Sequence, residues 1–598
     1  MNEEKFETIF ARLADISTAS LNDSGFWSGE LSSSALATAV SIVAFKLSDP
    51  VGLNKKIGSG YEWLRNNINE DGGFGDTPES VSNLSTTLLA YAAIRFCASD
   101  SPDRSQILIR IGQYLDLQGI NVNSTKIVAS ILGYYGKDYT FSLPILSMLV
   151  ICRVLDEKAL ELIPSLPFEL TLLPASLYRF FNLQVVSYAI PALVAVGIYL
   201  FKHKRRKGAV ATFVRNRAID PSLRKLQVIM PESGGFLEAI PLTAFVSMCL
   251  ILSGFDAHPV VSKGIGFLKQ QQRADGSWPI DTDLSTWGTT LMIKAMGRHI
   301  HEILSEDQVK GLRNHLLSSQ YQHVHPFNNA RPGGWGWTSF SGCVPDADDT
   351  AGAILALDLL KAGEAVNKSM LMGCFWLAGL QNRDGGIPTF CKGWGRLPFD
   401  SSCADLTGHV LLAWIRSIDQ LPGQGMGKEI NKLKGHISGA MRYLEKEQKP
   451  DGSWLPLWFG NQLTQDKTNP VYGTARVTVY LQDALECKSP DGGFRQRIEQ
   501  MANNARHYLS DQQNSDGSWG AYLGIQGSLE ETALAISALV KTHPVKCERG
   551  FEWLAREFEA TGLRPNPIGL YFATLWYHEK IYPLAFYLEA VRRCAKTY

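Results

Sequence analysis

The sequence has no excess of charge of either sign, because 58 Lys and Arg residues balance 58 Asp and Glu residues. Proteins that bind nucleic acid carry a basic surface, so this balance argues against a nucleic-acid partner. The ten Cys residues include no CxxC pair and no Cys/His cluster with zinc spacing. We therefore expect no metal site and no cofactor, and we interpret the cysteines as reduced core residues of a cytosolic protein.

Long apolar runs are also scarce. Residues 185–201 form an uncharged, mainly apolar run that is just short of the ~20 residues needed to span a bilayer, and Pro191 interrupts it. A basic stretch follows from Lys202 to Lys207. A buried core helix is one interpretation. The other, which we prefer, is an apolar insert at about residues 161–207 that dips into one leaflet, with its basic rim on the headgroups. It would place the protein on the cytoplasmic side of a membrane as a monotopic protein.

The N-terminal residues MNEEKFETIFARLADIST predict an acidic amphipathic helix rather than a signal peptide. The 598 residues are enough for several domains, and 45% apolar residues can bury a large core. No further boundary is visible from composition alone, so the domain organisation has to come from internal repeats.

A fixed-spacing repeat dominates the chain. Five segments share the frame L-x3-Q-x2-D-G, although Ile replaces the Gln in the first, and they end at Gly72, Gly276, Gly385, Gly452 and Gly517. Apolar helices are expected to open near a series of Thr residues, namely Thr87, Thr243, Thr289, Thr350, Thr407, Thr474 and Thr532. From the third Thr onward the spacings are 61, 57, 67 and 58 residues, which suit two helices and a loop. The repeat predicts an all-α fold, as a solenoid or a closed α/α barrel.

Three carboxylates, Asp346, Asp348 and Asp349, stand at the start of an almost wholly apolar helix after Pro345. A capped helix with an acidic first turn is the simpler explanation. Three acids in four residues, however, exceed what a cap requires, and aromatic residues precede them. Crowded carboxylates in a dry place cannot all ionise, so we expect at least one proton to be retained. A retained proton that faces an aromatic cavity suits the protonation of a weak base such as an alkene.

The segment PDADDT resembles the D-x-D-D acid motif of class II terpene cyclases, and the Gln–Trp turns resemble the QW motifs of squalene–hopene cyclases. This resemblance covers nearly the whole chain. It implies two α/α barrels: residues 1–28 packed on a catalytic barrel of residues 272–598, and a second barrel of residues 29–271. It also implies that Asp348 is the general acid and that Asp346 and Asp349 are its flanking carboxylates.

A second motif, ADLTGHVLLAW, places Asp405 and His409 four residues apart on one helix face. A surface pair that satisfies itself would explain this spacing, and a His held by a carboxylate has a fixed tautomer and a raised pKa. The motif is similar to the D-x-T-x-H of the family. By that resemblance His409 would hydrogen-bond to Asp348 and help to reprotonate it, while Asp405 would orient His409.

A carbocation that moves along a polyene needs aromatic faces, each of which stabilises it by roughly 0.5 to 2 kcal/mol. Plain core packing remains the alternative for every aromatic residue of the chain. By resemblance to the family, the candidates that would stabilise the cation are Trp287, Trp337, Phe390, Trp458, Tyr571, Phe572 and Trp576.

The chain departs from the family at Gly288, where the family has the Asp of a W-D-T segment. The loop between Phe390 and Asp405 looks shorter than in squalene–hopene cyclases, and the loop from Trp458 to Tyr472 looks longer. These loops border the cavity in the family, so a different cavity shape is expected in this chain, and squalene is not the default substrate. A shorter polyprene, or one with a polar or aromatic head, is the alternative.

The sequence-based hypothesis is therefore an isomerase-type class II terpene cyclase that cyclises a linear polyprene after protonation. The substrate would be squalene or a related isoprenoid, with a shorter or aryl-bearing polyprene of the meroterpenoid type as the alternative. The expected partners are this apolar substrate and a membrane surface, with a possible homodimer. A non-catalytic α/α-barrel protein that binds lipids is the alternative from another class. A prenyltransferase subunit would need a zinc site that the sequence does not show at a recognisable spacing.

Overall fold

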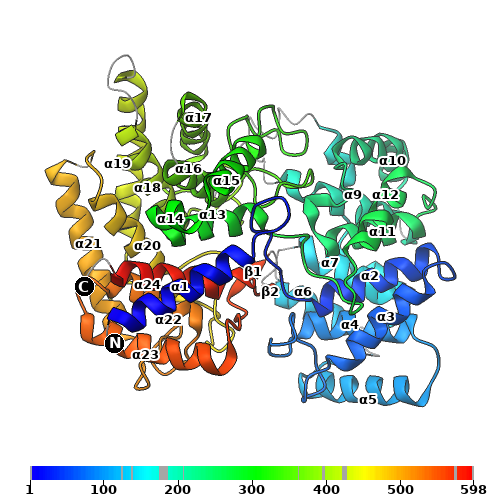
Figure 1. The fold of residues 1–598 in the computed structure, drawn as a ribbon. Coiled ribbons are helices and arrows are strands. Elements are labelled where there is room, and N and C mark those ends of the chain that lie inside the picture. Colours follow the sequence, from blue (N-terminus) through cyan, green and yellow to red (C-terminus); the bar gives the residue numbers. More distant parts are fainter. Residues whose placement is uncertain are drawn as a thin grey trace.

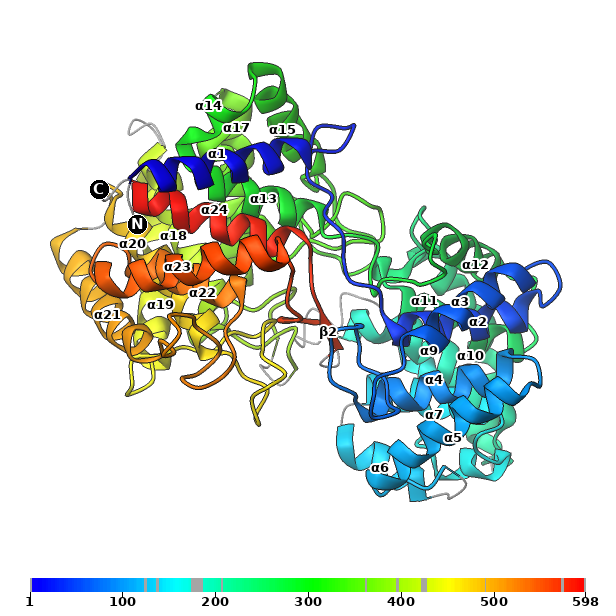
Figure 2. The same ribbon diagram turned by 60° about the horizontal axis from the view of Figure 1, so that its bottom comes forward.

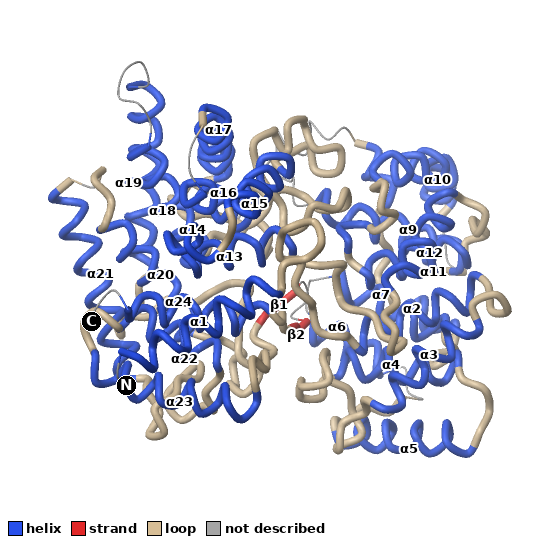
Figure 3. The backbone as a smooth tube through the Cα atoms, viewed as in Figure 1, coloured by secondary structure: helices blue, strands red, loops and turns tan. Residues whose placement is uncertain are grey.

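The computed structural model describes residues 3–122, 126–135, 139–173, 186–205, 208–360, 363–393, 397–420, 427–489, 491–571 and 575–595. The chain folds into two helical bodies that lie side by side (Figure 1). Among the described residues, the named strands are one short antiparallel pair, β1 (Gly569–Tyr571) and β2 (Leu575–Tyr577), which lies between the two bodies (Figure 3).

The first body, the N-terminal barrel, has an inner ring of helices whose members each pack on the next, with the last returning to the first. These inner helices are nearly apolar on all faces and are buried as such a pattern predicts. They are α2 (Ala35–Ser48), α4 (Leu84–Cys97), α7 (Tyr139–Ile151), α9 (Val186–His203) and α11 (Ile240–Leu252). The outer layer contains α3 (Asn54–Asn66), α5 (Pro102–Leu117), α6 (Lys126–Tyr135), α10 (Ala209–Ile229) and α12 (Pro259–Gln271), with the short turns η1 (Glu157–Leu162), η2 (Phe168–Leu172) and η3 (Phe236–Glu238).

The second body, the C-terminal barrel, closes in the same way. Its inner ring is α13 (Ser285–Met296), α16 (Ala347–Leu360), α18 (Ala404–Gln420), α20 (Pro470–Leu485), α22 (Leu529–Leu539) and α24 (Ile581–Ala595). Its outer layer is α15 (Glu306–Ser319), α17 (Glu364–Leu380), α19 (Gly427–Glu447), α21 (Gly492–Asp511) and α23 (Pro544–Thr561), after the short η4 (Gly297–His299) and α14 (Ile300–Ile303). The first helix of the chain, α1 (Glu3–Ala19), packs against α24 (Figure 2).

The Gln–Trp turns fasten each outer helix to the next. In the turn that ends at Trp454, the indole N–H donates to the carbonyl oxygen of Leu444 at 2.9 Å, so the Trp of the repeat satisfies a free carbonyl near the end of α19. The amide of Gln448 donates to the Gly452 oxygen at 3.0 Å and to the Met501 oxygen of α21 at 2.9 Å. Gly452 has φ of 90°, a conformation that favours glycine.

The Thr residues of the repeat bind the turns from the inner side. Thr474 accepts a hydrogen bond of 3.0 Å from the backbone N–H of Trp454. The turn at Trp278 instead donates to Thr38 of α2, which closes the N-terminal barrel. Thr289 of α13 binds the backbone N–H of Trp27 at 3.1 Å, so the N-terminal segment supplies the last closing contact of the C-terminal barrel.

The interpretation of residues 185–201 as a segment that dips into a membrane is wrong for helix α9. Its side chains from Tyr188 to Phe201 are almost all buried, because α9 belongs to the inner ring and packs between α7 and α11. A helix that is apolar on every face needs such a position. No helix within the described part of the chain has both the length and the apolar character to cross a bilayer.

Candidate active site

The three clustered acids lie where α16 begins, between two loops that hold them in place. The N–H of Asp346 donates to the carbonyl oxygen of Trp335 at 2.9 Å, and the N–H of Ala347 donates to the oxygen of Thr389 at 2.8 Å. The helix N-terminus adds a partial positive charge that stabilises carboxylates nearby. The acids are therefore held by backbone contacts from both neighbouring repeats.

Asp346 and Asp349 form a buried pair. The N–H of Asp349 donates to Oδ1 of Asp346 at 2.9 Å, while Oδ2 of Asp346 and Oδ1 of Asp349 have no hydrogen-bond partner among the described residues. Burial raises the pKa of Asp346 to about 7. Burial, reinforced by the adjacent charge of Asp346, raises the pKa of Asp349 well above its ordinary value. At neutral pH the pair keeps a proton, as we expect for crowded dry carboxylates.

Asp348 points away from this pair, toward His409 of α18. Its Oδ1 lies 2.6 Å from Nδ1 of His409, and the Asp348 side chain is 25% exposed whereas His409 is almost fully buried. Burial lowers the pKa of His409, and the Asp348 contact opposes that shift. The short contact holds one proton between a carboxylate that solvent or substrate can reach and an imidazole that neither can reach.

Asp405 does not orient His409 through a hydrogen bond, contrary to the sequence-based expectation. Its Oδ1 accepts a hydrogen bond from the Cys403 thiol, and the described contacts include none between Asp405 and His409. Asp405 lies at the N-terminus of α18, where its carboxylate turns back toward the preceding residues. The His409 ring is instead held by stacking on Tyr480, with 4.6 Å between ring centroids. Burial raises the pKa of Asp405 to about 6.

Arg476 of α20 is a buried cation that sequence reasoning missed. Its guanidinium donates to the Tyr480 hydroxyl and lies over the rings of Tyr480 and Trp287, 5.0 and 5.8 Å from the centroids. Its Nη1 has no partner among the described residues. The positive charge contributes to lowering the pKa of His409. The available signal was an Arg in the middle of a helix whose neighbouring residues are mainly apolar.

An aromatic cluster continues from the acids toward the N-terminal barrel. Trp337 meets Phe390 edge to face at 5.9 Å, and Phe390 lies 5.8 Å from Phe399, which is 6.2 Å from Trp458. Tyr188 of α9 stacks on Phe399 at 5.5 Å. We call these five residues the aromatic box. The structure thus brings three of the predicted aromatic residues together and adds Phe399 and Tyr188, which the sequence pattern did not reveal.

The other predicted aromatic residues lie elsewhere. Trp287 faces His409 edge-on, with 6.3 Å between ring centroids, and is therefore beside the acid. Tyr571 of β1 donates to Asp281, while Trp576 of β2 donates its backbone N–H to Asp76 at 2.9 Å. No described ring contact joins Trp576 to the aromatic box. Phe572 lies outside the described residues.

Gly288, which stands at the position of the family Asp, faces the closing contact of the C-terminal barrel. A Cβ at this position would lie 3.3 Å from Cδ1 of Ile581 and 3.5 Å from the carbonyl oxygen of Trp27. A larger side chain would crowd α24 and the N-terminal segment. The missing carboxylate therefore leaves room for close packing at this contact.

An apolar cavity lies where the two barrels meet. The described side chains that line it are all uncharged and come from both barrels. They are Leu36, Leu89, Tyr135, Pro144, Ile145, Tyr188, Ala189, Ala192, Leu237, Ala239, Pro241, Leu242, Phe245, Leu397, Phe399, Tyr571 and Leu575. Tyr188 and Phe399 belong both to this lining and to the aromatic box, so the box connects the acid region with the cavity.

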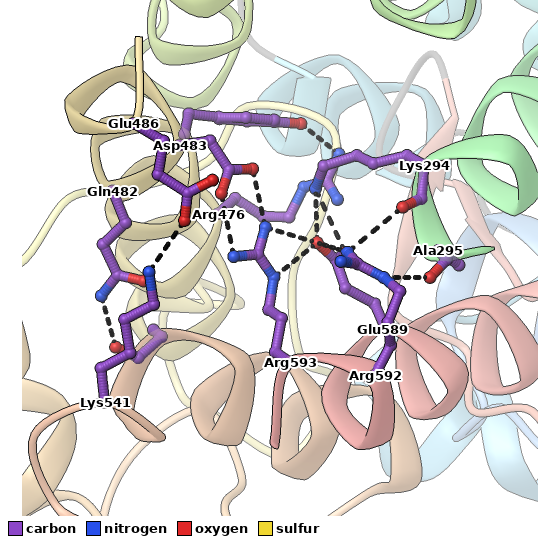
Figure 4. Close-up of polar contacts among 12 residues, drawn as sticks. Lys294, Ala295, Arg476, Gln482, Asp483, Glu486, Lys541, Glu589, Arg592 and Arg593 are labelled. Atoms are coloured by element: carbon purple, nitrogen blue, oxygen red, sulfur yellow. Dashed lines mark hydrogen bonds and ion pairs between the residues drawn. The ribbon is translucent and has the colours of Figure 1, made fainter. Parts of the chain in front are cut away.

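The opposite end of the inner ring carries an ionic network (Figure 4). Glu589 contacts Lys294 at 3.1 Å and Arg593 at 2.9 Å, and Arg593 contacts Asp483 at 2.7 Å. Arg592 donates to the backbone oxygen of Ala295 at 2.6 Å, near the C-terminus of α13. Cations at helix C-termini complement the helix dipole. Within the described ranges, no group of three or more His, Cys, Asp and Glu side chains is arranged to hold a metal ion.

Comparison with known proteins agrees with the fold. Residues 283–588 match the squalene-hopene cyclase C-terminal domain, and residues 11–152 match the N-terminal domain. Enfumafungin synthase from Hormonema carpetanum is 24% identical over 94% of this chain and 46% of its own length. Squalene hopane cyclase from Aspergillus fumigatus is 25% identical over 83% of this chain and 75% of its own length.

A terpene cyclase-glycosyl transferase fusion protein from Humicola fuscoatra is 27% identical over 54% of this chain and 26% of that protein. The chain therefore spans less than half the length of two of these relatives. The solved structure of ent-copalyl diphosphate synthase from Streptomyces platensis covers 99% of both chains with a TM-score of 0.57 and 17% identity. This likeness and the two domain matches confirm the predicted double α/α-barrel fold.

Proposed function

Since the chain belongs to the squalene–hopene cyclase family, we propose that it is a class II terpene cyclase that protonates a linear polyprene and cyclises it. The observation that carries this proposal is the 2.6 Å contact between Asp348 and His409 beside the buried Asp346–Asp349 pair. Burying the Asp346–Asp349 pair lowers the stability of the folded protein, and binding a lipid does not require such a pair.

In the proposed reaction, Asp348 gives its proton to one carbon of a terminal alkene, and the π electrons form the new C–H bond. The cation then develops on the neighbouring carbon and is attacked by the next double bond of the chain. His409 keeps a hydrogen bond to the Asp348 carboxylate and supports its reprotonation. The aromatic box offers π faces to the moving cation, each worth roughly 0.5 to 2 kcal/mol.

Squalene or a related linear isoprenoid is the substrate that we propose first, and a shorter or aryl-bearing polyprene is the alternative. The alternative is supported by Phe399, which comes from the loop between Phe390 and Asp405 and packs in the aromatic box. A bulky ring from this loop narrows the space beside Trp458 and so favours a chain of different length or shape. The formation of a homodimer remains a prediction from the sequence.

We also propose a peripheral contact with the cytoplasmic face of a membrane, through η2 and α10 rather than through α9. Leu170 and Leu172 of η2 and Phe213 of α10 are exposed, the last at 60%, and the two elements pack together. The Arg217 guanidinium lies 4.6 Å from the centroid of the Phe213 ring. Exposed apolar side chains with adjacent basic groups suit an interface with anionic headgroups. In this proposal residues 29–271 contact the membrane, and residues 272–598, with residues 1–28, form the catalytic barrel.

The activity is tested with detergent-solubilised protein, squalene and a chelator, followed by gas chromatography and mass spectrometry of the extract. We expect products of unchanged mass, or of mass plus one water, with the wild-type protein and none with Asp348→Asn. The exposed Asp116 of α5 provides the matched control Asp116→Asn, which should retain full activity. A folded and active Asp348→Asn variant would refute the assignment of the acid.

The membrane contact is tested by sedimentation with vesicles that contain anionic lipid. Phe213→Ser combined with Leu172→Ser is expected to reduce the bound fraction severalfold while the unfolding temperature stays unchanged. Val545→Ser, at an exposed apolar position on α23 of the other barrel, is the control. Equal binding of all three proteins would exclude η2 and α10 as the contact surface.

A further inference from the structure

Tyr571 and Asp281 form a polar pair in the wall of the apolar cavity. The Tyr571 hydroxyl donates to Oδ2 of Asp281 at 2.7 Å, and Oδ1 of Asp281 accepts from the N–H of Thr282 at 2.7 Å. Tyr571 lines the cavity, and Asp281 is completely buried behind it. Tyr571 therefore links the cavity wall to a completely buried carboxylate.

The other two tyrosines of the cavity have uncharged partners. The Tyr135 hydroxyl contacts that of Ser85 at 2.7 Å, and the Tyr188 hydroxyl accepts from the Asn328 amide at 2.8 Å. Among the described contacts, Tyr571 is thus the cavity tyrosine with a carboxylate partner. This hydroxyl can pass its proton to a neighbouring base when it receives one from the cavity.

Two more buried acids lie near Asp281, but both are used to hold the backbone. Glu238 accepts from the N–H of Gly342 at 2.7 Å and from the Ser233 hydroxyl at 2.6 Å, and Asp283 accepts from the N–H of Ser285 at 3.0 Å. No Lys or Arg is bonded to Asp281 in the described part of the chain. Burial, with the charges of Glu238 and Asp283, raises the pKa of Asp281 well above its ordinary value, and the hydrogen bond from Tyr571 opposes this shift because it stabilises the carboxylate.

Asp348 is not among the lining residues, whereas Tyr571 shares the lining with Leu237 and with helices of the N-terminal barrel. Tyr188 and Phe399 of the aromatic box also line the cavity, and at the other end of the box the backbone oxygen of Trp337 accepts from the N–H of Thr286, next to Trp287. A cation that starts at Asp348 and moves along the aromatic box would reach the cavity that Tyr571 lines, because Tyr188 and Phe399 belong to both the box and the lining.

We propose that Tyr571 and Asp281 form the base that ends the cyclisation, an inference that rests on the proposed function. A C–H bond next to the last cationic carbon breaks, and its electron pair forms a C=C bond. The released proton goes to the Tyr571 oxygen while the Tyr571 O–H proton goes to Asp281. The substrate gains one proton from Asp348 and loses one to this pair, so the product is an isomer of the substrate. After product release, the proton on Asp281 returns through the Tyr571 hydroxyl to water in the cavity, and Asp348 regains a proton from solvent.

The proposal is tested with Tyr571→Phe, which keeps the ring and removes one oxygen, and with Asp281→Asn, which removes the proton acceptor. Wild-type and variant proteins are incubated with squalene, and both the consumption and the product ratio are measured by gas chromatography and mass spectrometry. An uncharged polyprene is the appropriate probe, because the described side chains that line the cavity include no Lys or Arg to bind a diphosphate group. Tyr587→Phe, at a buried tyrosine that packs on Phe558 of α23, is the control for loss of a hydroxyl.

Both variants are expected to consume squalene within about threefold of the wild-type rate, because protonation at Asp348 is intact. The share of the main alkene should fall at least tenfold, in favour of water adducts and of alkenes formed by earlier proton loss. Tyr587→Phe should give the wild-type pattern.

An unchanged product ratio in both folded variants would overturn the proposal. A folded Tyr571→Phe variant that no longer consumes substrate would also overturn it, since the pair would then act before termination. Loss of the folded protein in both variants, judged by circular dichroism, would make the pair a structural feature. If the wild-type protein converts neither squalene nor a shorter uncharged polyprene, the proposed function is refuted. The proposed role of Tyr571 and Asp281 is then refuted as well, because it rests on that function.

Discussion

The substitution Asp346→Asn is expected to stabilise the protein at pH 8. Burial raises the pKa of Asp346 to about 7 from an ordinary value of 3.8. Each pKa unit corresponds to 1.36 kcal/mol, so ionised Asp346 costs the native state about 4 kcal/mol at pH 8. Asn has no proton to lose, and its Oδ1 can still accept the 2.9 Å hydrogen bond from the N–H of Asp349.

The sign of the pH dependence follows from the direction of this shift. Native Asp346 holds its proton more tightly than the unfolded chain does, so unfolding releases a proton between pH 4 and pH 7. Stability therefore falls as pH rises through this window. At pH 4.5 the same calculation leaves a cost of about 1 kcal/mol. The gain from Asp346→Asn should thus be large at pH 8 and small at pH 4.5.

Thermal unfolding of the detergent-solubilised protein at both pH values measures this difference. Asp483→Asn is the matched control, because its pKa is shifted in the opposite direction. Arg593 donates to both oxygens of Asp483, at 2.9 and 2.7 Å, and its charge lowers the pKa of Asp483. That carboxylate stabilises the native state above its unfolded pKa, so its loss should lower the unfolding temperature most at pH 8. A gain from Asp346→Asn that is equal at both pH values would refute the reasoning, as would a loss at pH 8.

Three further predictions concern the neighbouring residues. His409→Ala should slow turnover by about 100-fold or more with a small change in unfolding temperature, since it removes a proton-transfer partner of Asp348; unchanged turnover would remove His409 from the mechanism. Arg476→Met should move the pH dependence of turnover to higher pH, because the Arg476 charge helps to lower the pKa of His409; an unshifted profile would contradict this coupling. Trp454→Phe should cost about 1 to 3 kcal/mol in the free energy of unfolding, because the Leu444 oxygen loses its indole donor, and the product pattern should not change. Denaturant titration measures the free energy of unfolding, and product analysis measures the product pattern. An unchanged free energy or a changed product pattern would contradict this prediction.

The parts of the fold that depend on neighbouring residues could be predicted from the sequence. The turn around Trp454 is an example, because Gln448, Gly452 and Thr474 bind within one repeat and recur at a fixed spacing. The position of the acids at the start of α16 followed from the same local pattern.

Contacts between repeats or between barrels could not be read in this way. Asp405 and His409 are four residues apart on one helix, yet each has its partner elsewhere: Asp405 in the preceding loop and His409 on α16 and α20. Apolar composition alone could not decide whether α9 faces lipid or the inner ring. Tyr188 joins the aromatic box because the two barrels meet there. The pattern of residues along the sequence does not show how the barrels meet.

The balanced net charge of the chain conceals a strong separation of charge along the C-terminal barrel. The N-termini of α16 and α18 carry Asp346, Asp348, Asp349 and Asp405, whereas Lys294 and Arg593 lie near the C-termini of α13 and α24. Because both arrangements complement the helix dipoles, the parallel inner ring stabilises them together. The cations of this ionic network bind Glu589 and Asp483 at that end. A carbocation formed at the acid end therefore meets carboxylates and aromatic faces. The separation of charge is incomplete, however, because Arg476 and Lys294 both lie over the Tyr480 ring, which stacks on His409.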